Sequence, residues 1–199
     1  MPTFFCKSNI ANRDSRYNTE IMKLPQYTMK PQDVVLLLKL ISLPIEYLTQ
    51  KAVAKDLNMS QSEVSESVAR SKYAGLLDPT GKKVMKLALM EFLQYAIRYV
   101  FPQQLGPVVR GIPTAHSAPP LNAEIQSSEQ YVWPSAKGPI RGHGIRPLYP
   151  SVIEAVQNDS ILYELLALVD ALRVGRAREK TLAIQELKMR IIDGKYSGK

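Results

Sequence analysis

The sequence of 199 residues contains a single cysteine, Cys6, and only two histidines, His116 and His143. One cysteine cannot form a disulfide framework or a zinc site built on paired cysteines, and two histidines exclude a histidine-rich metal site. No apolar run approaches the roughly 18 residues needed to span a bilayer. Residues 1–10 also lack the long apolar core of a signal peptide. We therefore expect a cytoplasmic protein with no metal and no membrane partner.

The chain also lacks the motifs on which most enzyme chemistry depends. It has no P-loop, no dinucleotide-binding glycine pattern, no metal-ligand cluster and no candidate for a nucleophilic triad. We therefore predict a protein that is not an enzyme and that needs no cofactor.

Positive charge is in excess. Lys and Arg number 26 against 18 Asp and Glu, which gives a net charge of +8 at pH 7 and a pI near 9.5. Residues 1–100 hold 14 of the basic and 9 of the acidic residues, so the excess lies mainly in the first half. Such a balance suits a polyanionic partner but does not identify one. Since 45% of the residues are hydrophobic, the chain can still build a core.

Proline and glycine divide the chain into regions. Nine of the 14 prolines and five of the ten glycines lie in residues 101–150, whereas the flanking regions show helical periodicity. This pattern predicts a mainly α-helical protein. Its four regions are a loose N-terminal arm (1–27), a helical domain (28–100), an extended Pro/Gly-rich belt (101–150) and a C-terminal helical region (151–199).

Two helices are predicted at the start of the helical domain. Pro31 suits the first position of a helix, where its missing N–H costs nothing, and the apolar run that follows ends at residues 42–44. Thr49 is a predicted cap of the second helix, whose apolar face includes Val53 and Leu57.

A three-residue break at 58–60 separates the second helix from a third, predicted over Gln61–Tyr73. Ser60 and Glu63 fit the S-x-x-E capping box. In this motif the serine hydroxyl accepts the glutamate N–H, and the glutamate carboxylate turns back to the serine N–H. Two short helices with a three-residue break have the spacing of a helix-turn-helix.

A wing is predicted after the third helix. Gly75 suits the residue that ends this helix, the sequence at 78–81 is typical of a turn, and residues 82–84 would form a return strand. Two short strands around a basic tip match the winged variant of the helix-turn-helix. A further amphipathic helix is predicted over Val84–Val100, with Leu87 on its apolar face.

The stretch from residue 50 to residue 64 resembles the helix-turn-helix of bacterial and phage repressors. Asn58 can adopt a positive φ at the turn, where these motifs often use glycine. Over residues 28–100 the chain resembles bacterial winged helix-turn-helix transcription regulators, such as the MarR-like group. Ser67 departs from the pattern, in which an apolar residue is common, and Val68 would take its packing role. The resemblance implies double-stranded DNA as the partner and a homodimer that reads two half-sites.

In this arrangement the first turn of the third helix would enter the major groove and present short polar side chains to base edges. The candidates for base contacts are Ser60, Gln61, Ser62, Ser65 and Glu66. Glu66 either accepts a bond from cytosine N4 or argues against DNA binding. The candidates for contacts with the DNA backbone are Thr49, Arg70, Lys72, Lys82 and Lys83. The N-terminal arm is either a floppy terminus or a further backbone contact, and the alternative for all these residues is a solvated polar face.

Residues 101–150 are too apolar for a solubilising linker, and two interpretations remain. The belt packs over the neighbouring helices with Trp133 as a buried anchor. Alternatively, it holds an anion, a ligand or a partner. The side chains for such a site are Arg110, His116, Arg141, His143 and Arg146, which show no nucleophile–base spacing.

Helices are again predicted beyond Pro150. Ser151 and Glu154 form a second S-x-x-E box before a short helix. Asp159 or the following serine would cap a longer helix over residues 161–174.

Gly175 is expected to break or kink this longer helix, and a last helix follows over Ala177–Ile192. The apolar stripe of the longer helix is too wide for a helix exposed on its own. Its members are Ile161, Leu162, Leu165, Leu166, Val169 and Leu172. The stripe forms either a dimer or partner surface, or a packing surface against the belt.

We predict a DNA-binding transcriptional regulator, a dimeric repressor that reads the major groove with the helix starting at Gln61. One alternative is an antitoxin-like protein, whose C-terminal helices and belt mask a second protein and whose DNA binding is autoregulatory. Another is a winged-helix adaptor that contacts only protein, for which the acidic Glu63 and Glu66 are the main support.

Overall fold

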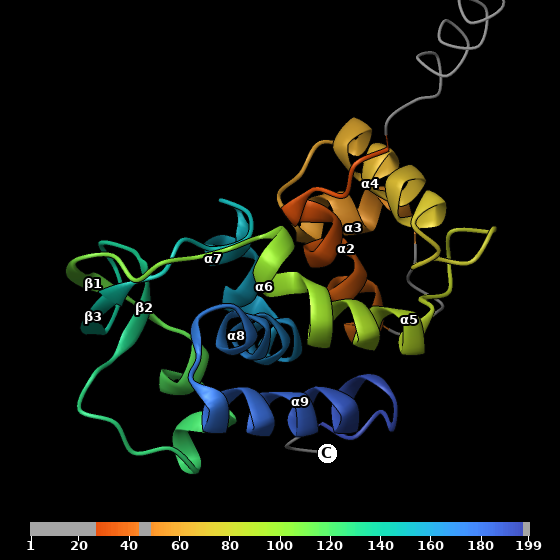
Figure 1. Ribbon diagram of the computed structural model, residues 1–199. Coiled ribbons are helices and arrows are strands. Elements are labelled where there is room, and N and C mark those ends of the chain that lie inside the picture. Colours follow the sequence, from red (N-terminus) through yellow and green to blue (C-terminus); the bar gives the residue numbers. More distant parts are fainter. Residues whose placement is uncertain (1–26, 44–48, 197–199) are drawn as a thin grey trace, which may run out of the picture.

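The computed structural model describes residues 27–43 and 49–196 and is mainly helical (Figure 1). Its α-helices are α2 (Pro31–Ser42), α3 (Gln50–Asp56), α4 (Gln61–Tyr73), α5 (Lys86–Glu91), α6 (Ile97–Val100), α7 (Val152–Ala155), α8 (Ser160–Val174) and α9 (Ala177–Ile191). A π-helical segment, η2 (Phe92–Ala96), joins α5 to α6. The strands are β1 (Val108–Pro113), β2 (Tyr131–Pro134) and β3 (Ile140–Gly144). Short 3₁₀ turns are η3 (Ala115–Ser117), η4 (Leu121–Ala123) and η5 (Val156–Asn158).

The helix boundaries in the first half follow from local chemistry, as predicted. Pro31 stands at the first position of α2. The Thr49 hydroxyl caps α3 by accepting the N–H of Ala52, and Ser60 caps α4. Asn58 has a φ of 49° at the turn between α3 and α4. The apolar residues Leu57, Met59 and Val64 are buried where the two helices meet.

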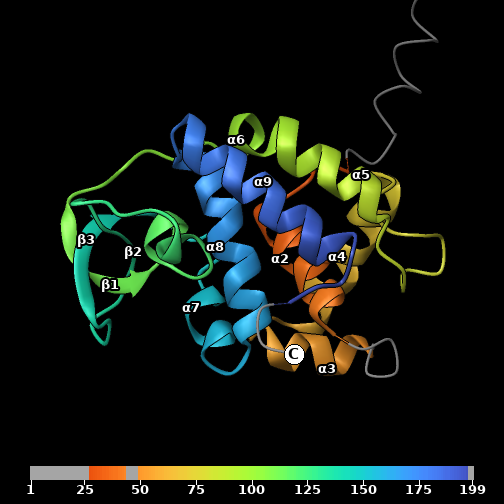
Figure 2. The ribbon, with the colours of Figure 1, turned by 90° about the horizontal axis from the view of Figure 1, so that it is seen from below.

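α8 is the central helix of the molecule, as Figures 1 and 2 show. It packs against α2, α6, α9 and the η3 turn. The prediction that its apolar stripe forms a dimer or partner surface is wrong. Leu162, Leu165 and Val169 are completely buried, Leu166 and Leu172 are nearly so, and Ile161 is half-buried. The chain covers this stripe with its own elements, and one hydrophobic core therefore runs from α2 to α9.

The predicted helix over Val84–Val100 exists as α5, η2 and α6 in succession. Residues that are four positions apart do not lie exactly above one another on a regular α-helix. The wider π-helical turn reduces this displacement. Leu89, Leu93 and Ile97 consequently all stay buried on the inner face. Leu87 was expected on that face, but it lies on the outer face and is 73% exposed.

The belt contains strands that the sequence pattern did not predict. β1 pairs antiparallel with β2 and with β3, and β2 pairs in parallel with β3, so the three strands close into a small barrel. Such close strands require glycine, because a Cβ on Gly111 of β1 would lie 2.1 Å from the carbonyl oxygen of Trp133 on β2. Trp133 on β2 is a buried anchor, as expected, and its indole N–H donates to Asp170 on α8 at 2.6 Å.

The C-terminal helices have the predicted order, with one correction. Asp159 caps α8 by accepting the N–H of Leu162, and α8 ends at Gly175. The second capping box does not form, because tertiary partners take both of its side chains. The Ser151 hydroxyl donates to the carbonyl of Leu57, and Glu154 accepts from the Asn58 side chain. None of the described helices is both long enough and apolar enough to cross a bilayer.

Candidate nucleic-acid interface

α4 lies at the edge of the molecule with one face packed and the opposite face open (Figure 1). Val64 and Ser67 are buried against the neighbouring helices. Five polar residues expected at base edges are all exposed in and after the first turn: Ser60, Gln61, Ser62, Ser65 and Glu66. The packing of α4 therefore leaves its polar face available to a partner.

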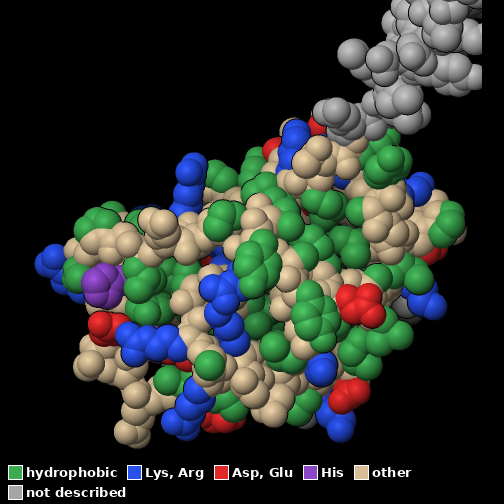
Figure 3. Space-filling view, in the orientation of Figure 1, with side chains coloured by type: hydrophobic (Ala, Val, Ile, Leu, Met, Phe, Trp, Pro, Cys, Tyr) green, Lys and Arg blue, Asp and Glu red, His purple; other side chains and the backbone are tan. Residues whose placement is uncertain are grey.

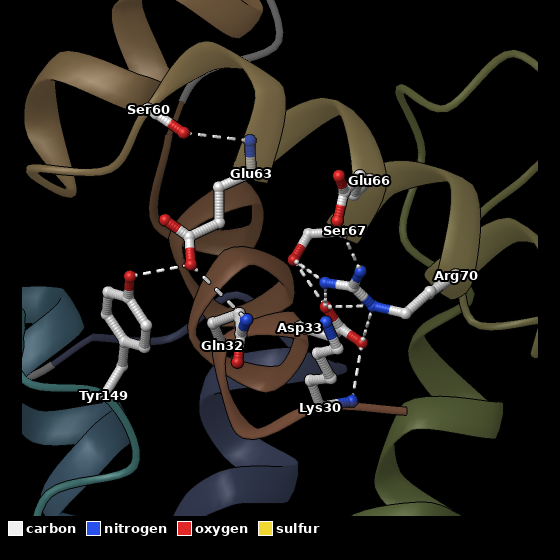
Figure 4. Close-up of polar contacts among 9 residues, drawn as sticks. All are labelled: Lys30, Gln32, Asp33, Ser60, Glu63, Glu66, Ser67, Arg70 and Tyr149. Carbon is white, nitrogen blue, oxygen red and sulfur yellow. Dashed lines mark hydrogen bonds and ion pairs between the residues drawn. The ribbon is translucent and has the colours of Figure 1, made fainter. Parts of the chain in front are cut away.

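Arg70, expected at the DNA backbone, belongs to a buried ion pair instead. Its guanidinium donates to both carboxylate oxygens of Asp33, with Nη2 to Oδ1 at 2.7 Å and Nε to Oδ2 at 2.9 Å (Figure 4). Asp33 is completely buried and also accepts from the Ser67 hydroxyl and from the backbone N–H of Lys30. The bond to Asp33 raises the pKa of Arg70. This guanidinium cannot reach a phosphate without breaking the pair, so the prediction for Arg70 is wrong.

The same cluster accounts for the serine at position 67, where an apolar residue is common. The sequence placed Val68 in the packing role that Ser67 lacks, but Ser67 itself is fully buried and satisfied by its bond to Asp33. Val68 is half-buried and lies below the loop after α4, where a Cβ at Gly81 would approach its Cγ1 to 3.0 Å. A hydroxyl thus replaces the apolar residue because an acid lies opposite it.

Only half of the capping box at Ser60 forms. The Ser60 hydroxyl accepts the N–H of Glu63 at 3.1 Å, as predicted. The Glu63 carboxylate turns inward rather than back to Ser60, and it accepts from the Tyr149 hydroxyl at 2.7 Å and from the Gln32 side chain (Figure 4). The bond to Glu63 raises the pKa of Tyr149. Glu63 therefore joins α4 to the end of the belt and does not face a nucleic acid.

Glu66 remains on the open face but is not isolated. One of its carboxylate oxygens lies 3.3 Å from Nη1 of Arg70, one turn further along α4. Its side chain is 62% exposed. Because Asp33 already pairs with this guanidinium, Glu66 still brings a negative charge to the polar face.

The loop after α4 is a compact turn and not a two-stranded ribbon. Its strand pairing amounts to one bridge between Leu77 and Val84, so the predicted return strand is shorter than expected. Asp78 organises the tip by accepting the backbone N–H groups of Lys82 and Lys83 at 2.9 and 2.8 Å. Its bond from the Thr80 hydroxyl is the largest of the effects that lower its pKa to about 2.

The lysines of this loop point away from the fold. Because Asp78 engages only the backbone of Lys82 and Lys83, both side chains stay exposed. Lys72 on α4 and Thr49 at the start of α3 are exposed as well. These residues can contact a polyanion without rearrangement, unlike Arg70.

An open groove runs beside the polar face of α4. It has a volume of about 640 Å³ and lies between α4 and the segment that precedes α2. Its lining includes Thr28 and Lys30 on one side and Ser62, Ser65 and Ala69 on the other. The groove thus extends the polar surface of α4 and adds a lysine to it.

The structure does not gather the five basic residues of the belt into one site. Arg110 and Arg141 face each other across β1 and β3 and are exposed, as is Arg146. His116 is buried, with Nε2 2.9 Å from the carbonyl oxygen of Glu129. His143 bonds through Nδ1 to the carbonyl of Gly106. No group of three or more His, Cys, Asp or Glu within the described ranges could hold a metal ion.

Asp33 and Tyr149 are the residues that reasoning from sequence missed at this site. Asp33 was hidden in an apolar helix, where its only signal is an acid among residues that are otherwise buried. Tyr149 lies 86 residues from its partner Glu63, and no local spacing connects them.

Comparison of the chain with protein-family models, with curated proteins and with solved structures gave no match.

Proposed function

We propose that the protein is a DNA-binding transcription regulator. In this proposal α3 and α4 act as a helix-turn-helix, α4 enters the major groove, and the loop at 78–83 is a short wing. The observation that carries the proposal is the open face of α4. Its first turns are exposed, polar and free of large apolar side chains, next to the exposed lysines Lys72, Lys82 and Lys83. This combination suits base edges flanked by phosphates.

The fixed orientation of α4 supports the same proposal. A recognition helix must present its side chains in a defined position, and buried contacts hold α4 from behind. Asp33 on α2 binds Arg70, and Tyr149 at the end of the belt binds Glu63. One of the two acids that weighed against DNA binding is also turned away from the open face, because Glu63 faces inward to Tyr149.

The proposal predicts a steep dependence of DNA affinity on salt. Each lysine that neutralises a phosphate contributes about −0.9 to the slope of log K against log salt concentration. Replacing Lys82 and Lys83 together with alanine should flatten the slope by about 0.9 for each lost contact. The measurement is fluorescence anisotropy of a labelled duplex of mixed sequence over a salt series.

The matched control replaces Lys137 and Lys188 with alanine. Both are exposed, but they lie beside the small sheet and on α9, away from α4. The slope for this variant should equal that of the wild type. An unchanged slope for the Lys82 and Lys83 variant would remove the loop from the interface. Failure of the wild type to bind any duplex at low salt would refute the proposal and favour a protein-binding adaptor.

Gln61 provides the most direct test of whether α4 recognises particular DNA bases. A bidentate bond from glutamine to adenine contributes about 1–3 kcal/mol of discrimination against the wrong base. After a preferred site is selected from random duplexes, Gln61→Ala should bind it roughly 5- to 150-fold more weakly and bind random DNA almost unchanged. An equal loss on both duplexes would show that Gln61 does not read bases.

Two variants separate this effect from folding. Gln185→Ala changes an exposed glutamine on α9 and should alter neither affinity. Ser60→Ala removes the cap of α4 and should lower the free energy of unfolding by about 1 kcal/mol. Thermal unfolding, measured beside binding, distinguishes a lost cap from a lost base contact.

A further inference from the structure

The outer face of the helix formed by α5, η2 and α6 is unusually apolar for an exposed surface. Leu87, Tyr95 and Tyr99 are 73%, 66% and 75% exposed, and Val100 is 46% exposed. Figure 3 shows hydrophobic side chains gathered over α5 and α6, and Figure 2 shows these helices along one outer edge of the molecule. Contiguous exposed apolar residues of this kind mark interaction surfaces, and tyrosine is enriched where proteins associate.

Three exposed charged residues on this helix have no ion-pair partner among the described residues, namely Lys86, Glu91 and Arg98. Glu91 is exposed and lies between Leu87 and Tyr95, each four residues away. Arg98 is exposed and lies 5.5 Å from the centre of the Tyr99 ring. Partial burial lowers the pKa of Lys180 on α9, and Arg98 lowers it further, although Glu179 opposes this. Glu91 and Arg98 thus place one negative and one positive side chain on this helix, seven residues apart.

We propose that this face is a self-association surface on which two copies of the chain pair with antiparallel helices. A twofold axis between residues 94 and 95 sets Glu91 of one copy opposite Arg98 of the other. The symmetry repeats this contact, so Arg98 of the first copy lies opposite Glu91 of the second. It also brings the two Tyr95 rings together near the axis and places each Tyr99 close to Leu87 of the other copy. In this pairing each copy contributes the same charged and apolar residues to the contact, as an isologous interface requires.

The role of this dimer rests on the proposed function, in which α4 binds DNA. In Figure 1 α4 lies above the helix formed by α5, η2 and α6, whose outer face points towards the viewer. A twofold axis that is vertical in this view reverses the helix and keeps α4 above it. Both copies of α4 therefore lie on one side of the dimer, where a single duplex can reach them.

The test is sedimentation equilibrium of the full chain without DNA over the micromolar range. The wild type should dimerise, and Tyr95→Asp and Tyr99→Asp should each abolish dimerisation. Val108→Asp is the matched control, because it places the same charge on an apolar residue of β1 that is 51% exposed. Circular dichroism of each variant shows that the fold is retained.

A charge exchange tests the antiparallel arrangement. Glu91→Arg or Arg98→Glu alone should weaken the dimer by roughly tenfold, because each change sets like charges opposite each other twice. The double variant Glu91→Arg/Arg98→Glu restores opposite charges and should recover the affinity of the wild type.

A monomeric wild type, or a dimer that tolerates the tyrosine variants, would overturn the proposal. A double variant that stays weak would overturn the antiparallel pairing. The dimer is measured without DNA, so its absence would not contradict DNA binding by α4. In the same way, a failure to bind DNA would not contradict the dimer.

Discussion

Asp33→Ala is expected to lower the free energy of unfolding by about 3–5 kcal/mol, because it leaves the Arg70 guanidinium buried without its anion. The same change removes the acceptor of the Ser67 hydroxyl and of the Lys30 N–H. An unpaired buried charge is among the few defects that cost this much. Urea denaturation followed by circular dichroism measures the loss.

Two variants show that the loss arises from the buried charge. Glu66→Ala removes the exposed partner of the same guanidinium, and an exposed pair contributes only about 0.2–1 kcal/mol. Replacing both buried partners, as Asp33→Leu with Arg70→Met, should recover most of the stability, since apolar residues of similar volume often substitute for a buried pair. If Asp33→Ala cost no more than Glu66→Ala, the pair would not hold α4 in place.

Asp170→Ala should have an effect of similar size at the other end of the molecule, about 3–5 kcal/mol. Asp170 on α8 is buried and accepts from the Arg173 guanidinium at 2.7 Å, from the Trp133 indole at 2.6 Å and from the Thr114 hydroxyl at 2.9 Å. Its removal leaves two neutral donors without this acceptor and leaves the Arg173 guanidinium without its anion, with the carbonyls of Phe101 and Arg146 as acceptors. The carboxylate is therefore the group that ties the small sheet to the central helix.

The sequence supplies its own probe for this prediction, because Trp133 is the only tryptophan in the chain. In Asp170→Ala its fluorescence emission should shift to longer wavelength as water reaches the indole, and its unfolding midpoint should fall. Trp133→Phe removes a single neutral donor and should cost about 1.5–3 kcal/mol, less than the loss of the carboxylate. An Asp170→Ala protein with wild-type stability and emission would contradict this role for the carboxylate.

These contacts bear on function because several of them converge on α4 and on the turn before it. Tyr149, Ser151 and Glu154 reach Glu63, Leu57 and Asn58, respectively. The segment after β3 therefore supports the unit formed by α3 and α4 from behind, while α2 supports it through Asp33. If α4 reads DNA, variants in either support should weaken binding without touching DNA.

The sequence by itself determined where most helices begin and end. Pro31, Thr49, Ser60 and Asp159 start helices, and Gly175 ends one, where local chemistry predicted. Caps can be read in this way because donor and acceptor lie within a few residues of each other. The polar face of α4 was also predictable, since residues that alternate with buried ones at helical spacing must point outward.

The tertiary structure alone decided which charged and apolar groups are available. Arg70 looked like a phosphate contact until Asp33, 37 residues away, was found to bind it. The apolar stripe of α8 looked like an interface, yet the rest of the chain covers it, whereas Leu87 and the tyrosines of α5, η2 and α6 were left outside. Periodicity shows that a helix has an apolar face and does not show what will cover it. That depends on contacts between distant segments, which form only when the whole chain packs.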